Sequence, residues 1–207
     1  MTRARFIVRV VKPAAFLLML LPAVLLLARG IGGELGANPV ETITRSTGDW
    51  TLRLLLLTLA VTPLRRLTGW GELLRLRRMI GLFSFFYACL HLATYVVLDL
   101  GFNLSWVAED VVKRPYITLG FSVFLLLLPL ALTSTNRAIR RLGRRWKRLH
   151  RLVYLCAIGG VIHFLWLVKA DLRTPLIYLA VLLLLFALRI PGRWFRLPPL
   201  SARRPVG

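Results

Sequence analysis

Acidic residues are scarce in this sequence of 207 residues, which has eight Asp and Glu against 29 Lys and Arg and a formal net charge of +21. A strongly positive charge is typical of nucleic-acid-binding proteins. Here, however, the basic residues form short clusters between long apolar runs, without an RNA-binding signature or the ligand spacing of a zinc finger. The charge distribution therefore argues against a nucleic-acid partner.

The sequence also lacks the motifs and the polar length of a soluble enzyme. It contains neither GxGxxG nor GxxxxGK, and loops of at most about 20 residues leave no room for a separate soluble domain. Its two cysteines, Cys89 and Cys156, lie in apolar runs without a CxxC pair, as small buried residues do. Whatever the protein does must therefore take place in or at a membrane.

Hydrophobic residues are abundant, at 57% of the chain, and the mean hydropathy is +0.70. A membrane-spanning helix needs about 20 residues. Six segments reach that length, and we predict an all-α integral membrane bundle of six transmembrane helices, with the basic, apolar N-terminal stretch retained as the first span. The predicted spans are 11–30, 50–68, 79–98, 115–134, 151–169 and 174–190. Accordingly, 1–10 is the N-terminal segment, 11–190 the transmembrane domain and 191–207 a basic tail.

The basic residues predict the orientation of this bundle. The N-terminus, the loops after the second and fourth spans and the tail hold 22 of the 29 basic residues, and seven of the eight acids lie on the other side. Because positive loops stay in the cytoplasm, both termini are predicted to be cytoplasmic.

Two of the three histidines are predicted to lie deep in the membrane. His91 follows Arg78 by 13 residues and His163 follows Arg151 by 12, which places each roughly 18–20 Å into an outward-running helix. Two imidazoles at matched depth on different helices can bind one haem iron from both sides. Gly159 and Gly160 share the helix face of His163 and would let a flat macrocycle approach. The alternative for each histidine alone is a hydrogen bond that bridges two helices.

His150 lies near the cytoplasmic edge, 13 residues before His163. It is a candidate ligand of a second, inner haem, although no fourth histidine is available to pair with it; the alternative is an ordinary interfacial residue. Three arginines are candidate contacts of haem propionates or of membrane lipid: Arg53 at the outer side, where snorkelling to the surface is the alternative, and Arg78 and Arg151 at the inner side.

Several stretches of the chain resemble the ferric-reductase-like transmembrane domain, which NADPH oxidases and iron reductases share. Within that family the resemblance is greatest to the haem-binding membrane subunits of bacterial systems that repair methionine sulfoxide. The stretches are LGANPVE (35–41), TLAVTPLRRL (58–67), RRMIGLFSFFYACLH (77–91), KRPYITLGF (113–121), PLALTSTN (129–136) and RRLGRRWKRLHRLVYL (140–155).

This resemblance implies a multi-pass protein of the bacterial inner membrane that contains haem b and FMN. It implies a non-catalytic electron-transfer subunit without catalytic residues of its own, with His91, His150 and His163 as haem-ligand candidates. The electron donor would be the respiratory quinol or a cytoplasmic flavin reductase. The acceptor would be MsrP, a periplasmic molybdopterin reductase for methionine sulfoxide. The wider family has two histidines in the third span, and this chain has only His91 there, so a second haem with two histidine ligands stays open.

Two other readings of the residues remain. A cytochrome b subunit or metal reductase with another partner would share the same histidine pair. A cofactor-free transporter or membrane anchor would be expected to carry deep acidic residues or broken helices. No Asp or Glu lies deep within any predicted span, which favours the haem hypothesis.

Overall fold

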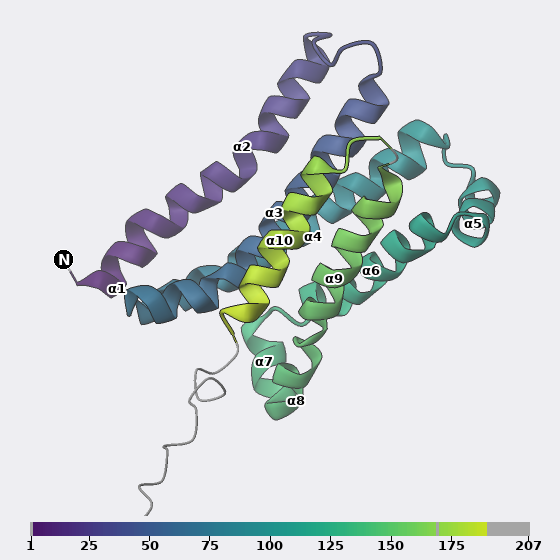
Figure 1. The fold of residues 1–207 in the computed structure, drawn as a ribbon. Coiled ribbons are helices and arrows are strands. Elements are labelled where there is room, and N and C mark those ends of the chain that lie inside the picture. Colours follow the sequence, from purple (N-terminus) through teal and green to yellow (C-terminus); the bar gives the residue numbers. More distant parts are fainter. Residues whose placement is uncertain (1, 169, 190–207) are drawn as a thin grey trace, which may run out of the picture.

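The computed structural model describes residues 2–168 and 170–189, and all regular elements within these ranges are helices (Figure 1). The long helices are α2 (Lys12–Ile31), α3 (Pro39–Thr68), α4 (Leu74–Ala93), α6 (Pro115–Leu132), α9 (Leu152–Leu167) and α10 (Arg173–Ala187). The short ones are α1 (Arg3–Phe6), η1 (Ile7–Val11), η2 (Gly71–Leu73), η3 (Thr94–Asp99), α5 (Leu104–Lys113), α7 (Asn136–Leu142) and α8 (Arg144–Leu149). The all-α prediction is confirmed for the described residues.

Within the described residues, a long helix lies in each of the six predicted segments. Four helical stretches are long and apolar enough to cross a membrane, namely Ala4–Ile31, Gly71–Asp99, Pro115–Leu132 and Arg144–Leu167. The helix α3 is long but carries charged residues towards both ends, and α10 has 15 described residues. Six spans with cytoplasmic termini therefore remain a prediction.

The helix boundaries differ from the predicted ones in two places. Helical structure starts at Arg3, within the segment predicted to precede the first span, and runs through η1 into α2. The second long helix starts at Pro39, well before residue 50. The Asn38 side chain caps it by accepting a hydrogen bond from the Glu41 amide, and Pro39 supplies a preset helical φ. The basic tail 191–207 lies outside the described residues.

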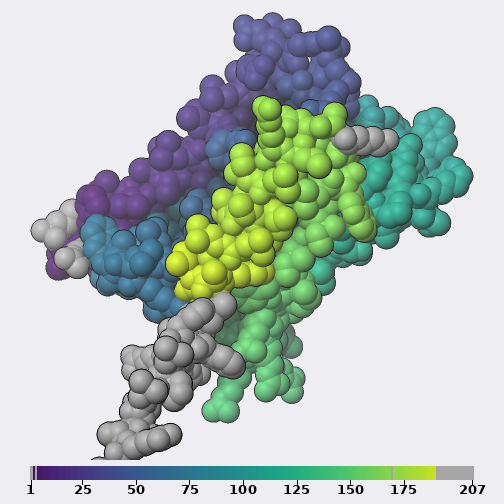
Figure 2. All heavy atoms as spheres, viewed as in Figure 1, coloured from purple at the N-terminus to yellow at the C-terminus, as the bar shows by residue number. Residues whose placement is uncertain are grey.

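The long helices run alternately up and down, so chain reversals gather at two ends of the molecule (Figure 1). The first residues, the α3–α4 turn, α7, α8 and the end of α10 lie at one end, which we call the basic end. The α2–α3 loop, α5 and the α9–α10 connection lie at the opposite end, which we call the acidic end. Figure 2 shows α10 on the near face, over the rest of the bundle.

Two apolar clusters hold the helices together. The larger one joins α3, α4, α6, α9 and α10 around fully buried Leu59, Cys156 and Ala157. The smaller one joins α2, α3 and α4 around Tyr87. The Tyr87 hydroxyl donates to the Met19 carbonyl at 2.8 Å and accepts from the Ala23 amide at 3.1 Å. It thereby sits between a carbonyl and an amide that would otherwise pair within α2. These contacts fix α4 and α9 in the bundle, and both carry a deep histidine.

Candidate functional site

The side chains of His91 on α4 and His163 on α9 meet inside the bundle. Their ring centres lie 6.3 Å apart, and the ring planes are nearly perpendicular at 81°. The two residues are 72 positions apart in the sequence, and only the packing of α4 and α9 brings them together. The counting of residues from the basic end had predicted that they lie at similar depth.

Each imidazole is oriented by a main-chain carbonyl. The Nδ1 atom of His91 lies 2.9 Å from the Thr44 carbonyl oxygen, and the Nδ1 atom of His163 lies 2.7 Å from that of Tyr116. A carbonyl oxygen can only accept a hydrogen bond, so Nδ1 must carry the proton in both rings. In the neutral imidazole this leaves the lone pair on Nε2, the arrangement that metal-binding histidines adopt.

Two glycines make room for these rings. A Cβ atom on Gly48 would lie 3.1 Å from Cε1 and Nδ1 of His91, and one on Gly120 would lie 2.7 Å from Cε1 of His163. A Cβ points back towards the preceding helical turn, where the carbonyl four residues earlier lies. Glycine at these positions therefore opens the carbonyls of Thr44 and Tyr116 to a donor from outside the helix.

The same pattern of contacts occurs twice along the chain. Each histidine lies 47 residues after the residue whose carbonyl it binds, and each glycine lies four residues after that residue. The α3–α4 hairpin supplies Thr44, Gly48 and His91, while the pair α6 and α9 supplies Tyr116, Gly120 and His163. Neither Gly48 nor Gly120 was predicted from the sequence. Aligning the sequence with itself so that His91 is matched to His163 also matches Gly48 to Gly120, and this repeat would have identified both glycines.

The geometry of this pair fits an iron with two axial histidines. Metal–nitrogen bonds of about 2 Å, with each ring centre roughly 1 Å farther away, would place the two ring centres about 6 Å apart. The observed 6.3 Å agrees with that value. The fixed Nδ1 protons leave the required Nε2 lone pairs, and aromatic side chains such as Phe85 and Phe164 belong to the surrounding apolar cluster. The residues present therefore fit a haem.

Gly159 and Gly160, predicted to provide a haem-packing face, contact other helices. A Cβ on Gly159 would lie 2.6 Å from Cγ2 of Val123 on α6, and a Cβ on Gly160 would lie 3.4 Å from Cδ1 of Leu52 on α3. These contacts show that the two glycines allow close helix packing. A contribution to haem binding by either remains a prediction.

His150 lies near the basic end, in the turn between α8 and α9, and not beside the other two histidines. Its Nε2 atom lies 3.0 Å from the Thr133 hydroxyl, and its ring stacks on Trp146 with centres 3.9 Å apart. The Trp146 indole N–H in turn donates to the Thr133 carbonyl. This arrangement holds the imidazole in place between α6 and α8, and a role as ligand of a second haem remains a prediction.

The three arginines predicted as propionate or lipid contacts differ in their surroundings. The guanidinium of Arg53 donates through Nε to the Tyr178 hydroxyl at 2.9 Å, pairs with Asp49 at 3.4 Å and lies 5.1 Å from the centre of the Trp50 ring. Arg78 donates to the Asn136 side chain, which links α4 to α7. The side chain of Arg151 is exposed.

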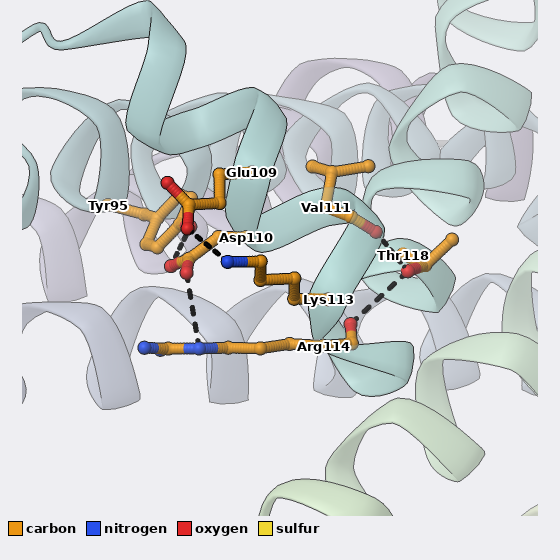
Figure 3. A network of polar contacts seen from close by, with 7 residues as sticks. All are labelled: Tyr95, Glu109, Asp110, Val111, Lys113, Arg114 and Thr118. Carbon is orange, nitrogen blue, oxygen red and sulfur yellow. Dashed lines mark hydrogen bonds and ion pairs between the residues drawn. The ribbon is translucent and has the colours of Figure 1, made fainter.

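At the acidic end, α5 is held by a small polar network (Figure 3). Asp110 accepts a hydrogen bond from the Tyr95 hydroxyl at 2.8 Å and pairs with Arg114 at 3.2 Å. Lys113 pairs with Glu109, and this hydrogen bond and the carboxylate charge raise the pKa of the Lys113 amine. The network leaves Leu104 and Val112 exposed on the surface of α5, a surface suited to contacts outside the chain.

Comparisons with known proteins agree with this geometry. Residues 47–161 match the family model described as "Ferric reductase like transmembrane component". The chain is 50% identical over 187 residues to the "Protein-methionine-sulfoxide reductase heme-binding subunit MsrQ" of Herminiimonas arsenicoxydans. The aligned region covers 89% of this chain and 86% of that protein. The protein with the same description from Rhodospirillum rubrum is 54% identical over 178 residues, or 86% of each chain. That from Azospira oryzae is 55% identical over 186 residues, or 88% of this chain and 79% of that one.

Proposed function

The chain belongs to the MsrQ family of ferric-reductase-like membrane proteins, and we propose that it is the haem-binding electron-transfer subunit of a protein-methionine-sulfoxide reductase system. In this proposal it takes electrons from the quinone pool of the bacterial inner membrane. It delivers them to a periplasmic molybdenum reductase of the MsrP type, which repairs oxidised proteins. The chain itself carries out no chemistry on methionine sulfoxide.

One observation carries the proposal, namely the pair of imidazoles contributed by α4 and α9. The residues that would hold the iron are His91 and His163, with ring centres 6.3 Å apart. A haem b bound between them would supply a one-electron carrier within the membrane.

The remaining residues of the site orient and shield the two ligands. The carbonyls of Thr44 and Tyr116 accept the Nδ1 protons, which fixes both rings and makes each Nε2 a better donor to a metal. Gly48 and Gly120 let the rings reach those carbonyls. Leu55, Ala88 and Val161 belong to the larger apolar cluster, which packs α3, α4 and α9 together, and apolar surroundings are one of the factors that set a haem potential.

The partner surface belongs to the proposal as well. If the basic end is cytoplasmic, the acidic end faces the periplasm, and the α2–α3 loop, α5 and the α9–α10 connection form the surface for the reductase. The matched depth of the two histidines, towards the acidic end, supports this direction of electron flow. A second haem at His150 and an FMN are further expectations, and the haem and flavin content of the purified protein tests both.

The ligand assignment is tested by replacing each histidine with alanine in the full chain. His91→Ala and His163→Ala should each abolish the six-coordinate spectrum of a b-type cytochrome and its reduction by quinol. His150→Ala removes an imidazole from the same bundle but outside this pair, so it should leave the haem between His91 and His163 bound and reducible by quinol, whether or not a second haem is lost. Full Soret absorbance in either of the first two variants would refute the assignment.

The assignment of the partner needs a separate measurement. Wild-type protein in vesicles with quinol should reduce a purified MsrP-type enzyme, which is followed by its turnover of methionine sulfoxide. His91→Ala vesicles should not. Equal rates in vesicles without the protein would contradict the proposed transfer.

A further inference from the structure

The side chain of Arg189 lies within the bundle near the basic end, just after α10. One amine of its guanidinium donates to the Tyr154 hydroxyl on α9 and the other to the Leu59 carbonyl on α3. Its Nε atom is buried and has no hydrogen-bond partner among the described residues. The guanidinium also lies 5.1 Å from the centre of the Tyr154 ring. This side chain thus joins three helices through neutral acceptors alone.

Among the described residues, no carboxylate forms an ion pair with Arg189. The ion pairs among the described residues involve Glu41, Asp49, Glu109 and Asp110, which all lie towards the acidic end. Glu72 is the single acid that the sequence places at the basic end, and no acidic side chain follows Asp171.

The charges next to Arg189 further destabilise its positive charge. The charged side chains that interact electrostatically with Arg189 are Arg66 and Arg77, both positive. Arg66 also donates to the Leu188 carbonyl at 3.4 Å, which brings it next to Arg189. The Arg189 side chain is half-buried, and the partial loss of water together with like charges nearby disfavours an unpaired cation. An anion bound beside Arg189 would offset this positive charge.

We propose that Arg189, with Arg66 and Arg77 beside it, binds a phosphate group, that of an anionic phospholipid headgroup. A guanidinium presents its N–H groups as a fork that suits phosphate, and each terminal amine of Arg189 carries a second N–H beside the one that it donates to Tyr154 or Leu59. The site lies at the end of the bundle where basic residues gather, at the level of the inner-leaflet headgroups in the predicted orientation. This site is separate from the histidine pair, and it does not depend on the proposed electron transfer.

The test compares two arginine variants of the purified full chain. Arg189→Gln removes the half-buried charge, and Arg144→Gln removes an exposed charge from α8 at the same end. Native mass spectrometry with added phosphatidylglycerol or phosphatidylethanolamine counts the bound lipids. Wild type and Arg144→Gln should retain one phosphatidylglycerol in preference to phosphatidylethanolamine. Arg189→Gln should bind it roughly 10- to 100-fold more weakly, as the loss of a charged hydrogen bond predicts.

Two further arms complete the experiment. Competition with inorganic phosphate distinguishes a lipid headgroup from a free anion, because free phosphate displaces the lipid only if the site accepts phosphate without its acyl chains. Arg66→Gln, at an exposed position, should also weaken phosphatidylglycerol binding and serves if Arg189→Gln does not fold. Equal lipid binding by Arg66→Gln, Arg189→Gln and Arg144→Gln would overturn the site. So would a loss of bound haem in Arg189→Gln with lipid binding unchanged, because the anion would then be a haem carboxylate.

Discussion

At the scale of single residues, the site depends on two positions that have no side chain. Gly120 is the more confined of them, because an added Cβ would approach His163 to 2.7 Å, against 3.1 Å between an added Cβ at Gly48 and His91. Gly120→Ala should therefore push the His163 imidazole away from the Tyr116 carbonyl, at a cost of about 1–3 kcal/mol for overpacking. We expect a lower haem content and a shifted axial-ligand signature in electron paramagnetic resonance. Gly48→Ala should produce the same change to a smaller extent.

A matched control exists on α4. A Cβ on Gly81 would meet Thr58 at 3.8 Å, an ordinary contact, so Gly81→Ala should leave the haem spectrum unchanged. If Gly81→Ala and Gly120→Ala altered the spectrum equally, the effect would come from helix stability rather than from the histidine rings.

The histidine pair was predictable from the sequence, whereas its surroundings were not. Counting residues from the nearest arginine gave His91 and His163 similar depths, since the helical rise per residue is constant. Gly159 and Gly160 were predicted from their spacing to His163 along α9. That spacing identifies the shared helix face but not the helix that packs against it. Gly159 faces Val123 on α6, and the glycine that faces His163 is Gly120 on that same α6. Only the tertiary packing shows that Gly120, and not Gly159, contacts His163.

At the scale of helices, the close contact of α6 with α9 depends on Gly159. A Cβ there would lie 2.6 Å from Cγ2 of Val123, and valine cannot easily turn away because its χ1 is restricted. Gly159→Ala should destabilise the protein by about 1–3 kcal/mol. The double variant with Val123→Ala should recover much of that loss, because the second change removes the clashing methyl groups. Thermal unfolding in detergent measures both, and additive losses would contradict the contact.

The attachment of α5 gives a second prediction at this scale. Asp110 has a side chain that is 16% exposed and binds both Tyr95 and Arg114, whereas Glu109 pairs only with Lys113 and is 51% exposed. Exposed ion pairs contribute about 0.2–1 kcal/mol, and a hydrogen bond to a charged group roughly 1.5–3 kcal/mol. Asp110→Asn should therefore speed hydrogen exchange in 104–113 more than Glu109→Gln does. The reverse order would show that Tyr95 does not hold α5.

At the scale of the whole molecule, charge asymmetry predicts the topology. The basic end and the acidic end are separated by the length of the helices (Figure 1), and positive loops remain cytoplasmic. Alkaline phosphatase fused after Phe102 should be active, because that position lies at the acidic end. A fluorescent protein fused after Gly143 should fluoresce in the cytoplasm. Activity of alkaline phosphatase fused at Gly143 would reverse the orientation.

The helical architecture followed from composition, but the lengths of its helices did not. Apolar runs located all six long helices, because only a helix satisfies its own backbone in lipid. The first third of α3 escaped prediction, since 39–49 is polar and its helical state depends on the Asn38 cap and on packing against α4. The same polar residues include Thr44 and Gly48. The part of the helix that hydropathy could not find is therefore the part that orients His91.

The repeated arrangement of carbonyl, glycine and histidine also has a consequence for biosynthesis. The α3–α4 hairpin supplies the first set of carbonyl, glycine and histidine, and the pair α6 and α9 supplies the second set. The second set leaves the ribosome only after the first. Under the proposed function, the cofactor can be captured between two imidazoles only once α9 has entered the membrane. Haem acquisition is then a late event, and a nascent chain stalled before residue 152 should remain colourless.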